Sequence, residues 1–361
     1  MKIRILDRYL LMTWLRMYAV CQAGFMVTYL VIDVLEKFSR FSRSGVSGID
    51  MAGYFLLKLP EMFDNTAGFA VLMATILALG ALSRSSELTA MRSCGVSIAR
   101  LAAPVVVGGA LVSVVMFLNA ELVIPSSYKQ MDYIEKIKIK KQDRGTLFKL
   151  TNIWFKFDRM MLHAESFDPQ NVTLRTVTVW ELSPQMKPVT RIDAVRAVQE
   201  PGGQWVLQDA VVRSFAGSAP LRKETRVPIA LTLNREDLRV YDKNADNLSM
   251  LTLYRYTAML ERSGYDAGRF RTLMHAKLAN PCAAMVMVIL GLPFALKTGR
   301  SGGAARGVAF AVALGFGYFV INALILSYGK GSVLPAVVAA WGANLLFACA
   351  GIWLSMTVRQ Q

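Results

Sequence analysis

The feature that most constrains this 361-residue chain is a set of six apolar segments, each long enough to cross a lipid bilayer as a helix. A helix needs roughly 20 apolar residues to span the hydrocarbon core. The segments cover about residues 9–35, 52–82, 101–123, 272–296, 308–328 and 333–358. Charged residues make up 18% of the chain, against about 25% in soluble domains. The chain is therefore predicted to be an integral membrane protein.

A proline within the second apolar segment and another just after the third are expected to set helix boundaries. Pro60 is followed by Glu61 and Asp64, and a carboxylate at the bilayer centre costs roughly 2.5–3.5 kcal/mol. We therefore expect Pro60 to divide the segment and to open a helix. Residues 52–65 are expected to be helical near the outer interface, where the acids lie, and residues 66–82 to cross the hydrocarbon. A proton relay through these two acids is the less favoured interpretation. Pro125 is expected to end the third span.

From residue 126 to about residue 247 the pattern changes to alternation of apolar and polar residues. Alternating runs occupy residues 147–158, 172–182 and 204–215, with Pro and Gly turn signals between them. Short alternating strands at this spacing predict a β sandwich or jelly roll. The apolar positions fit a packed core, and a groove for acyl chains would give the same pattern.

The predicted fold class is thus an α-helical membrane protein with six transmembrane helices and an inserted all-β, jelly-roll-like domain. Its expected parts are residues 1–125, with spans one to three and a short inner helix at 84–99; residues 126–250, the β domain; and residues 251–361, with a connecting helix and spans four to six.

The orientation follows from basic residues in the short loops, which remain on the cytoplasmic side. The bases on one predicted side are Lys2, Arg4, Arg8, Arg84, Arg92, Arg100, Lys297, Arg300 and Arg306. Both termini are therefore expected in the cytoplasm, and the β domain is expected outside it. Lys37, Arg40 and Arg43 fall in the first outer loop against this rule, which suggests a binding role.

Several functional classes find no support in the sequence. The net charge of +16 comes without a nucleic-acid-binding motif, and the bases lie mainly beside apolar segments, where lipid headgroups account for them. The four cysteines and two histidines lack metal-ligand spacing, so no metal or cofactor is expected. No phosphate-binding loop and no hydrolase motif occurs. We therefore expect no catalytic residues, and any ATP-driven work needs a partner.

The inner helix at 84–99 is the most informative short segment. Leu88, Met91 and Ile98 recur at helical spacing around Gly95, beside Glu87. Such a helix can lie on the membrane interface. Alternatively, it can be a coupling helix that docks into a groove on a cytoplasmic ATPase, with Glu87, Leu88, Met91 and Gly95 as the contact residues.

A second group of candidate residues is basic. Lys37 and Arg40 follow the first span, while Lys136 and Lys138 belong to a run of bases that follows the third span. Together they can line an outer vestibule that neutralises phosphates or sugar acids. A solvated strand face beside anionic headgroups would give the same pattern.

The chain resembles the LptF/LptG permease family over essentially its whole length, with the β domain matching by pattern only. The resemblance is carried by LDRYL at residues 6–10, SSELTA at 85–90 with Gly95, SGYDAGR at 263–269, and Pro281. LDRYL and SGYDAGR are more like LptG than LptF.

The resemblance implies a bacterial inner-membrane subunit that pairs with an LptF-type subunit on two LptB-type ATPases. It also implies that the complex extracts lipopolysaccharide and that the β domain joins LptC and LptA in a periplasmic bridge. Glu87 matches the family's coupling-helix glutamate, and Lys37 and Lys136 match basic residues that contact lipopolysaccharide. Glu36 and Leu30 stand where the family has further bases.

Two other functions fit the same sequence features. The chain could be a docking or assembly scaffold in the inner membrane without a transport cycle, or an ABC permease for another lipid. A membrane enzyme is the weakest alternative, since no nucleophile is arranged with a base.

Overall fold

The computed structural model describes most of the chain, and it divides into a helical unit and a sheet unit. The described residues are 5–44, 47–135, 150–157, 159–168, 173–185, 187–200, 204–215, 221–229, 245–262, 266–297 and 304–359. The helical unit comprises Met1–Ile134, Asn247–Leu253 and Gly268–Gln361, and the sheet unit comprises Glu135–Asp246 and Tyr254–Ala267.

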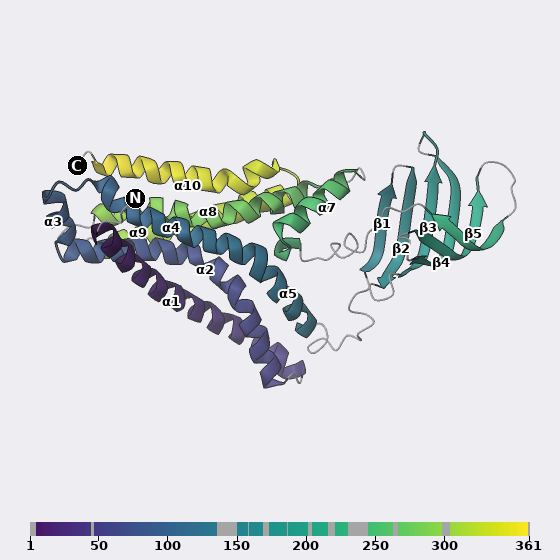
Figure 1. The fold of residues 1–361 in the computed structure, drawn as a ribbon, viewed down its shortest axis with the longest axis horizontal. Helices are drawn as coiled ribbons and strands as arrows, with labels where there is room; N and C mark the ends of the chain where they lie inside the picture. Colours follow the sequence, from purple (N-terminus) through teal and green to yellow (C-terminus); the bar gives the residue numbers. More distant parts are fainter. Residues whose placement is uncertain are drawn as a thin grey trace. The chain divides into compact units, whose positions relative to one another are not determined.

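Within its described residues, the helical unit contains six helices that are long and apolar enough to cross a membrane, which confirms the predicted helical class (Figure 1). Its elements are α1 (Ile5–Ser44), α2 (Gly48–Arg84), α3 (Glu87–Ser93), α4 (Ile98–Leu118), the π-turn η1 (Asn119–Val123), α5 (Ile124–Tyr133), α8 (Gly268–Lys297), α9 (Ala304–Lys330) and α10 (Ala336–Arg359).

Two expected helix boundaries are wrong. Pro60 lies inside the continuous helix α2 instead of opening it, and Pro125 lies at the start of α5 rather than ending the third span. α2 changes direction in its first half (Figure 1), which is expected because a proline inside a helix bends it. Helices in membranes tolerate proline because neighbouring side chains bond the backbone at the bend. Here the Asn119 amide donates to the Pro60 carbonyl at 2.8 Å.

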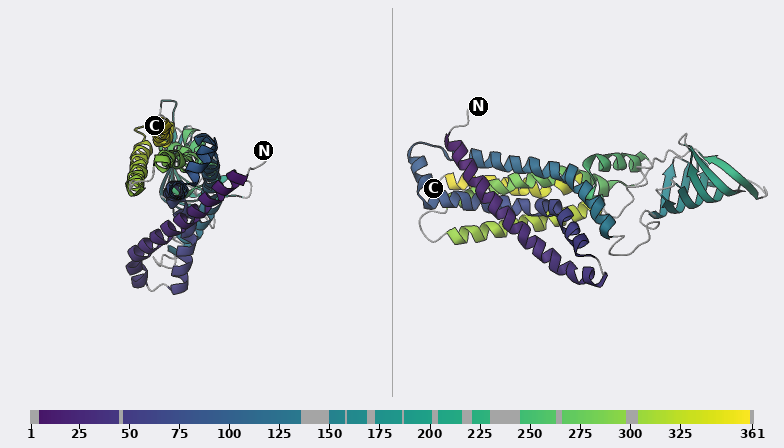
Figure 2. Two further views of the ribbon diagram at one scale, coloured as in Figure 1. Left: turned by 90° about the vertical axis from the view of Figure 1, so that its left-hand side faces the viewer. Right: turned by 60° about the horizontal axis from the view of Figure 1, so that its bottom comes forward.

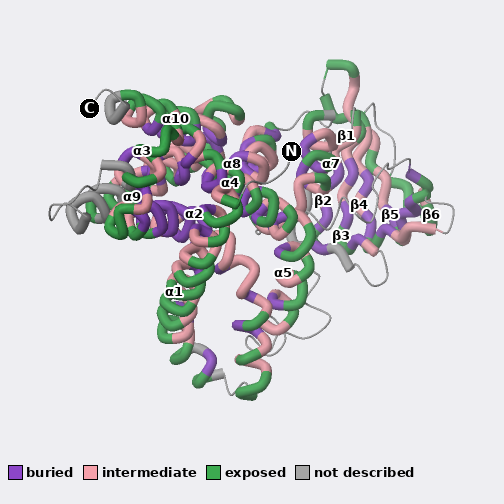
Figure 3. Tube along the Cα trace, turned by 60° about the vertical axis from the view of Figure 1, so that its left-hand side comes forward, coloured by how far each residue is buried: buried purple, intermediate pink, exposed green. Residues whose placement is uncertain are grey.

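α2 and α8 form the centre of the helical unit, while α1, α9 and α10 expose apolar faces (Figure 3). α1 crosses α2 and α4 obliquely, and its C-terminal half lies beside the N-terminal half of α2 (Figure 2). Exposed Val20, Leu35 and Phe316 are examples of the outward apolar side chains. Such faces are stable when the surrounding solvent is lipid.

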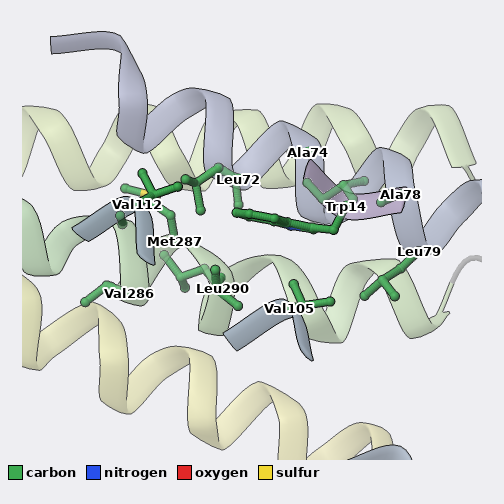
Figure 4. Close-up of a cluster of buried hydrophobic side chains, with 14 of the residues drawn as sticks. Trp14, Leu72, Ala74, Ala78, Leu79, Val105, Val112, Val286, Met287 and Leu290 are labelled. Carbon is green, nitrogen blue, oxygen red and sulfur yellow. The ribbon is translucent and has the colours of Figure 1, made fainter. Parts of the chain in front are cut away.

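The core of the helical unit combines one large aromatic residue with small residues on the facing helices. Trp14 is fully buried among apolar side chains of the core (Figure 4). Its indole N–H donates to Thr75 Oγ1 at 3.0 Å. A Cβ atom at Gly108 would lie 2.7 Å from the Trp14 ring, so only glycine lets α4 approach α1 this closely. Small residues allow such close backbone approach between membrane helices.

The later spans are joined by buried polar and aromatic contacts. Asn344 of α10 accepts a hydrogen bond from Tyr318 of α9 at 2.5 Å and donates to the Ala279 carbonyl of α8 at 2.7 Å. Phe319 stacks on Phe69 of α2 with ring centroids 4.1 Å apart. These contacts fix α8, α9 and α10 to one another and to α2.

The sheet unit confirms the inserted all-β domain. Its described strands are β1 (Leu150–Phe157), β2 (Met160–Asp168), β3 (Thr173–Leu182), β4 (Pro188–Gln199), β5 (Trp205–Ser214) and β6 (Arg222–Ile229). They pair antiparallel in chain order as one six-stranded sheet. Alternate residues such as Val177 and Val179 of β3 and Trp205 and Leu207 of β5 build its buried face, as the period of two requires.

The connecting helix α7 (Met250–Arg262) also forms as expected, preceded by a short 3₁₀ turn, η3 (Ala245–Asn247). Its first turn groups with the helical unit, and residues 254–262 group with the sheet unit. Met259 packs against the buried face of the sheet.

Candidate functional site

A cluster of charged side chains joins the C-terminal half of α1 to the N-terminal half of α2. The Lys58 ammonium donates to Asp33 Oδ1 at 2.6 Å, and Lys37 lies 3.0 Å from the same oxygen. Lys37 also donates to the Tyr54 hydroxyl at 3.1 Å. We call Asp33, Lys37, Tyr54 and Lys58 the lysine cluster.

The lysine cluster carries an excess positive charge in a largely desolvated place. Asp33 and Lys58 are each 7% exposed, and two ammonium groups share one carboxylate. Two charged groups of such low exposure are stable only when paired and hydrogen-bonded. The cluster therefore has a net charge of +1, and a phosphate or carboxylate of a ligand would neutralise it.

Aromatic rings surround this cluster on the helix α1 and α2 sides. Lys58 lies 5.9 Å from the Tyr29 ring centroid, within cation–π range, whereas Lys37 meets Tyr54 at its hydroxyl. Phe41 packs edge-on against Tyr54 with centroids 5.2 Å apart. Tyr29, Phe41 and Tyr54 thus supply the aromatic part of the surroundings of the two lysines.

The sequence-predicted basic residues have different outcomes. Lys37 lies in the lysine cluster. Arg40 belongs to α1, but its side chain lies outside the described residues, as do Lys136 and Lys138 altogether. Of the four predicted bases, Lys37 is therefore the one whose side chain and partners are described.

Sequence reasoning missed Asp33, Tyr54 and Lys58. A signal for Asp33 was available, because it precedes Lys37 by four residues and so shares a helix face with it. Lys58 is a lone lysine within an apolar segment, and such residues usually have a partner or a function. The pairing between α1 and α2 had no sequence signal.

The inner helix is shorter than the expected 84–99. α3 covers Glu87–Ser93, the chain turns at Gly95 with a φ of +80°, and Ile98 already begins α4. A positive φ favours glycine, so Gly95 allows the turn between α3 and α4.

Glu87 is held by two hydroxyl groups at the start of α3. Tyr9 of α1 donates to Oε2 at 2.7 Å, and Ser85 donates to Oε1 at 2.8 Å. The Tyr9 bond, followed by the Ser85 bond, lowers the pKa of the Glu87 carboxyl below its ordinary value. The carboxylate is thus ionised and oriented, and it links α3 directly to the first span.

The apolar residues of α3 face the helical unit. Leu88 is 5% exposed within the core, and Met91 packs against that core. They anchor the helix, whereas Thr89, Ala90 and Ser93 are exposed. Among the described residues no group of His, Cys, Asp and Glu side chains could hold a metal ion.

Comparison with known proteins agrees with the resemblance seen in the motifs. The profile of the family described as "Lipopolysaccharide export system permease LptF/LptG" matches residues 8–357. The chain is 24% identical over 336 residues to the lipopolysaccharide export system permease protein LptG of Haemophilus influenzae, which covers 90% of each chain. It is 23% identical over 393 residues to the protein of the same name from Escherichia coli K12, covering 98% of each.

The profile spans nearly the whole chain, and the curated relatives carry the LptG name, so the predicted family and its LptG-like character are confirmed. The chain belongs to the LptF/LptG family of lipopolysaccharide export permeases, multi-pass proteins of the bacterial inner membrane.

Proposed function

We propose that the chain is one permease subunit of an ABC transporter that extracts lipopolysaccharide from the inner membrane and passes it to a bridge of periplasmic proteins. The observation that carries the proposal is the lysine cluster, in which Lys37 and Lys58 share the single carboxylate of Asp33. Lipopolysaccharide presents phosphorylated sugars, which would complete the neutralisation of this cluster.

The proposed complex contains an LptF-type permease subunit, an LptB-type ATPase dimer, and the periplasmic proteins LptC and LptA. Both termini lie in the cytoplasm in this proposal, and the β domain of about residues 126–250 lies in the periplasm. The bases that follow the positive-inside rule support this orientation. Arg40, Lys136 and Lys138 are proposed as further bases that bind the phosphates or sugar acids of lipopolysaccharide.

The acyl chains require a different environment from the sugars. Exposing each CH₂ group to water costs about 0.8 kcal/mol, so the chains must remain against apolar surface during extraction. The exposed apolar side chains of α1 and α9, such as Val31 and Phe316, supply such surface.

Helix α3 is proposed to receive the motion of the ATPase. Ionised Glu87 offers an acceptor to a basic group of the partner, while Leu88 and Met91 anchor α3 in the helical core. A displacement of α3 would therefore move the adjoining spans. Gly95 supplies the turn that connects α3 to α4.

Charge reversal at the lysine cluster tests the proposal. Lys37→Glu places a second carboxylate beside Asp33 and should weaken crosslinking to lipopolysaccharide by about tenfold or more. Lys37→Arg should retain most of it. The measurement is photo-crosslinking of the purified membrane complex to lipopolysaccharide.

The matched control is Lys187→Glu, which makes the same charge change at an exposed turn of the sheet. Equal crosslinking of Lys37→Glu and the unaltered chain would contradict the proposal. Affinity purification from mild detergent supplies a second criterion: recovery of the chain without any ATPase would favour the scaffold function.

A further inference from the structure

The third span contains a π-turn at η1, where the helix is wound with one extra residue. The Ile124 N–H donates to the Asn119 carbonyl, five residues earlier. The next residue is Pro125, which has no N–H for a bond to Glu121 in the regular helical register. π-turns are rare and occur frequently at functional sites. Tertiary contacts are therefore expected to hold this one.

One such contact joins the π-turn to the bend of α2. The Asn119 side-chain amide donates to the Pro60 carbonyl and to Asp64 Oδ1, both at 2.8 Å. Lys277 of α8 lies within electrostatic range of the same carboxylate. Pro60 follows Lys58 by two residues, so the bend that Asn119 holds is the one that directs Lys58 and Tyr54 toward α1.

A second contact joins the π-turn to the start of α7. Glu121 accepts hydrogen bonds from the backbone N–H groups of Met250 at 2.7 Å and Leu251 at 3.4 Å. These are the first two amides of the helix, which have no acceptor within it. The negative charge also suits a helix N-terminus. The next two amides bond to Ser249: the Thr252 N–H donates to its hydroxyl oxygen, and the Leu253 N–H donates to its backbone carbonyl.

The two contacts depend on one backbone register. If the π-turn returned to the α-helical register, the turn would hold one residue fewer. The helix after the turn would then rotate by about 100° relative to the helix before it. Asn119 and Glu121 lie on the turn itself. After this change Asn119 could not keep its two acceptors on α2 while Glu121 kept its two donors on α7.

We propose that the π-turn Asn119–Val123 is a two-state junction that couples the bend of α2, and with it the lysine cluster, to the first turn of α7. In one state Asn119 holds Pro60 and Asp64 while Glu121 holds Met250 and Leu251. In the other state both contacts are released together. The role of the lysine cluster in this statement rests on the proposed function. The coupling between the two helices does not.

Residue-resolved amide hydrogen exchange on the full chain in its membrane complex tests the junction. Asn119→Ala removes the hold on α2 and should speed exchange of the Met250 and Leu251 amides by about tenfold, although Asn119 does not bond to α7. Reciprocally, Glu121→Ala should speed exchange in residues 48–59 of α2. Glu121→Gln keeps an acceptor oxygen and should restore most of the protection.

The control is Ser113→Ala on α4, whose buried hydroxyl has no hydrogen-bond partner among the described residues. Asn119→Asp, which is nearly isosteric and repels Asp64, serves if the alanine variant does not fold. The proposal would be overturned if Asn119→Ala sped exchange in α2 alone and Glu121→Ala sped exchange in α7 alone. It would also be overturned if Ser113→Ala sped exchange at the same amides to the same extent. The exchange measurement needs no lipopolysaccharide, so its failure leaves the crosslinking test of the proposed function standing.

Discussion

At the scale of residues, the lysine cluster shows how one carboxylate organises two helices. Asp33 contacts both Lys37 and Lys58, whereas each lysine has that one carboxylate in the cluster. Loss of the shared acid leaves two positive charges without a counter-charge. Loss of Lys58 leaves the ion pair between Asp33 and Lys37 in place. The consequences of the two changes should therefore differ.

Asp33→Asn is expected to destabilise the chain by ~3 kcal/mol, because breaking a buried ion pair leaves charges uncompensated. Lys58→Met should cost less, since Asp33 keeps Lys37 and the methionine fills similar volume. The measurement is the free energy of unfolding in mixed micelles with increasing denaturing detergent. Equal losses from the two variants would show that Asp33 is not the centre of the cluster.

At the scale of elements, close packing of helices depends on glycines that face large side chains. Gly108 of α4 lies against the Trp14 ring, and Trp14 in turn donates to Thr75 of α2. Three spans thus meet at one indole. Added volume at position 108 must displace the ring and break its hydrogen bond.

Gly108→Ala is expected to destabilise the helical unit by about 1–3 kcal/mol, the usual cost of overpacking a core. Gly80→Ala is the matched control, because a Cβ atom there would have no neighbour within 4 Å. That change should be neutral or slightly stabilising, since alanine is the better helix former. Thermal unfolding in detergent compares the two, and a smaller loss for Gly108→Ala than for Gly80→Ala would contradict this packing.

At the scale of the whole molecule, the arrangement in the membrane follows from the charges of the loops. The bases near residues 84–100 and 297–306 are expected on the cytoplasmic side. Cys94, the exposed residue that caps the C-terminus of α3, lies within the first of these two basic stretches, near residues 84–100. Exposed Lys187 lies in the turn between β3 and β4. The two positions should therefore be reached from opposite sides of the membrane.

In a chain without the other native cysteines, a membrane-impermeant thiol reagent added to intact spheroplasts should label Lys187→Cys and leave Cys94 unmodified. Opening the membrane should make Cys94 reactive, which serves as the control for its exposure. Labelling of Cys94 in intact spheroplasts would reverse the proposed orientation. The readout is the mass shift of the purified chain.

The sequence by itself determined the six spans, the inserted β segment and the family. These follow from properties that are local in the chain: runs of apolar residues, alternation with a period of two, and short motifs such as LDRYL at residues 6–10. Lys37 was found in the same way, because a base predicted in an outer loop breaks the orientation rule. The predicted start of that loop was wrong, since α1 continues through Lys37 to Ser44.

Only the tertiary structure decided the partners of Lys37, the continuation of α2 through Pro60 and the π-turn after α4. Local preference says that a proline in a helix interior is unfavourable, and it predicts a boundary at Pro60 and at Pro125. Asn119 lies 59 residues from Pro60 and Glu121 lies 129 residues from Met250. Bonds of this separation form only when the helices are packed, so no local pattern in the chain reports them.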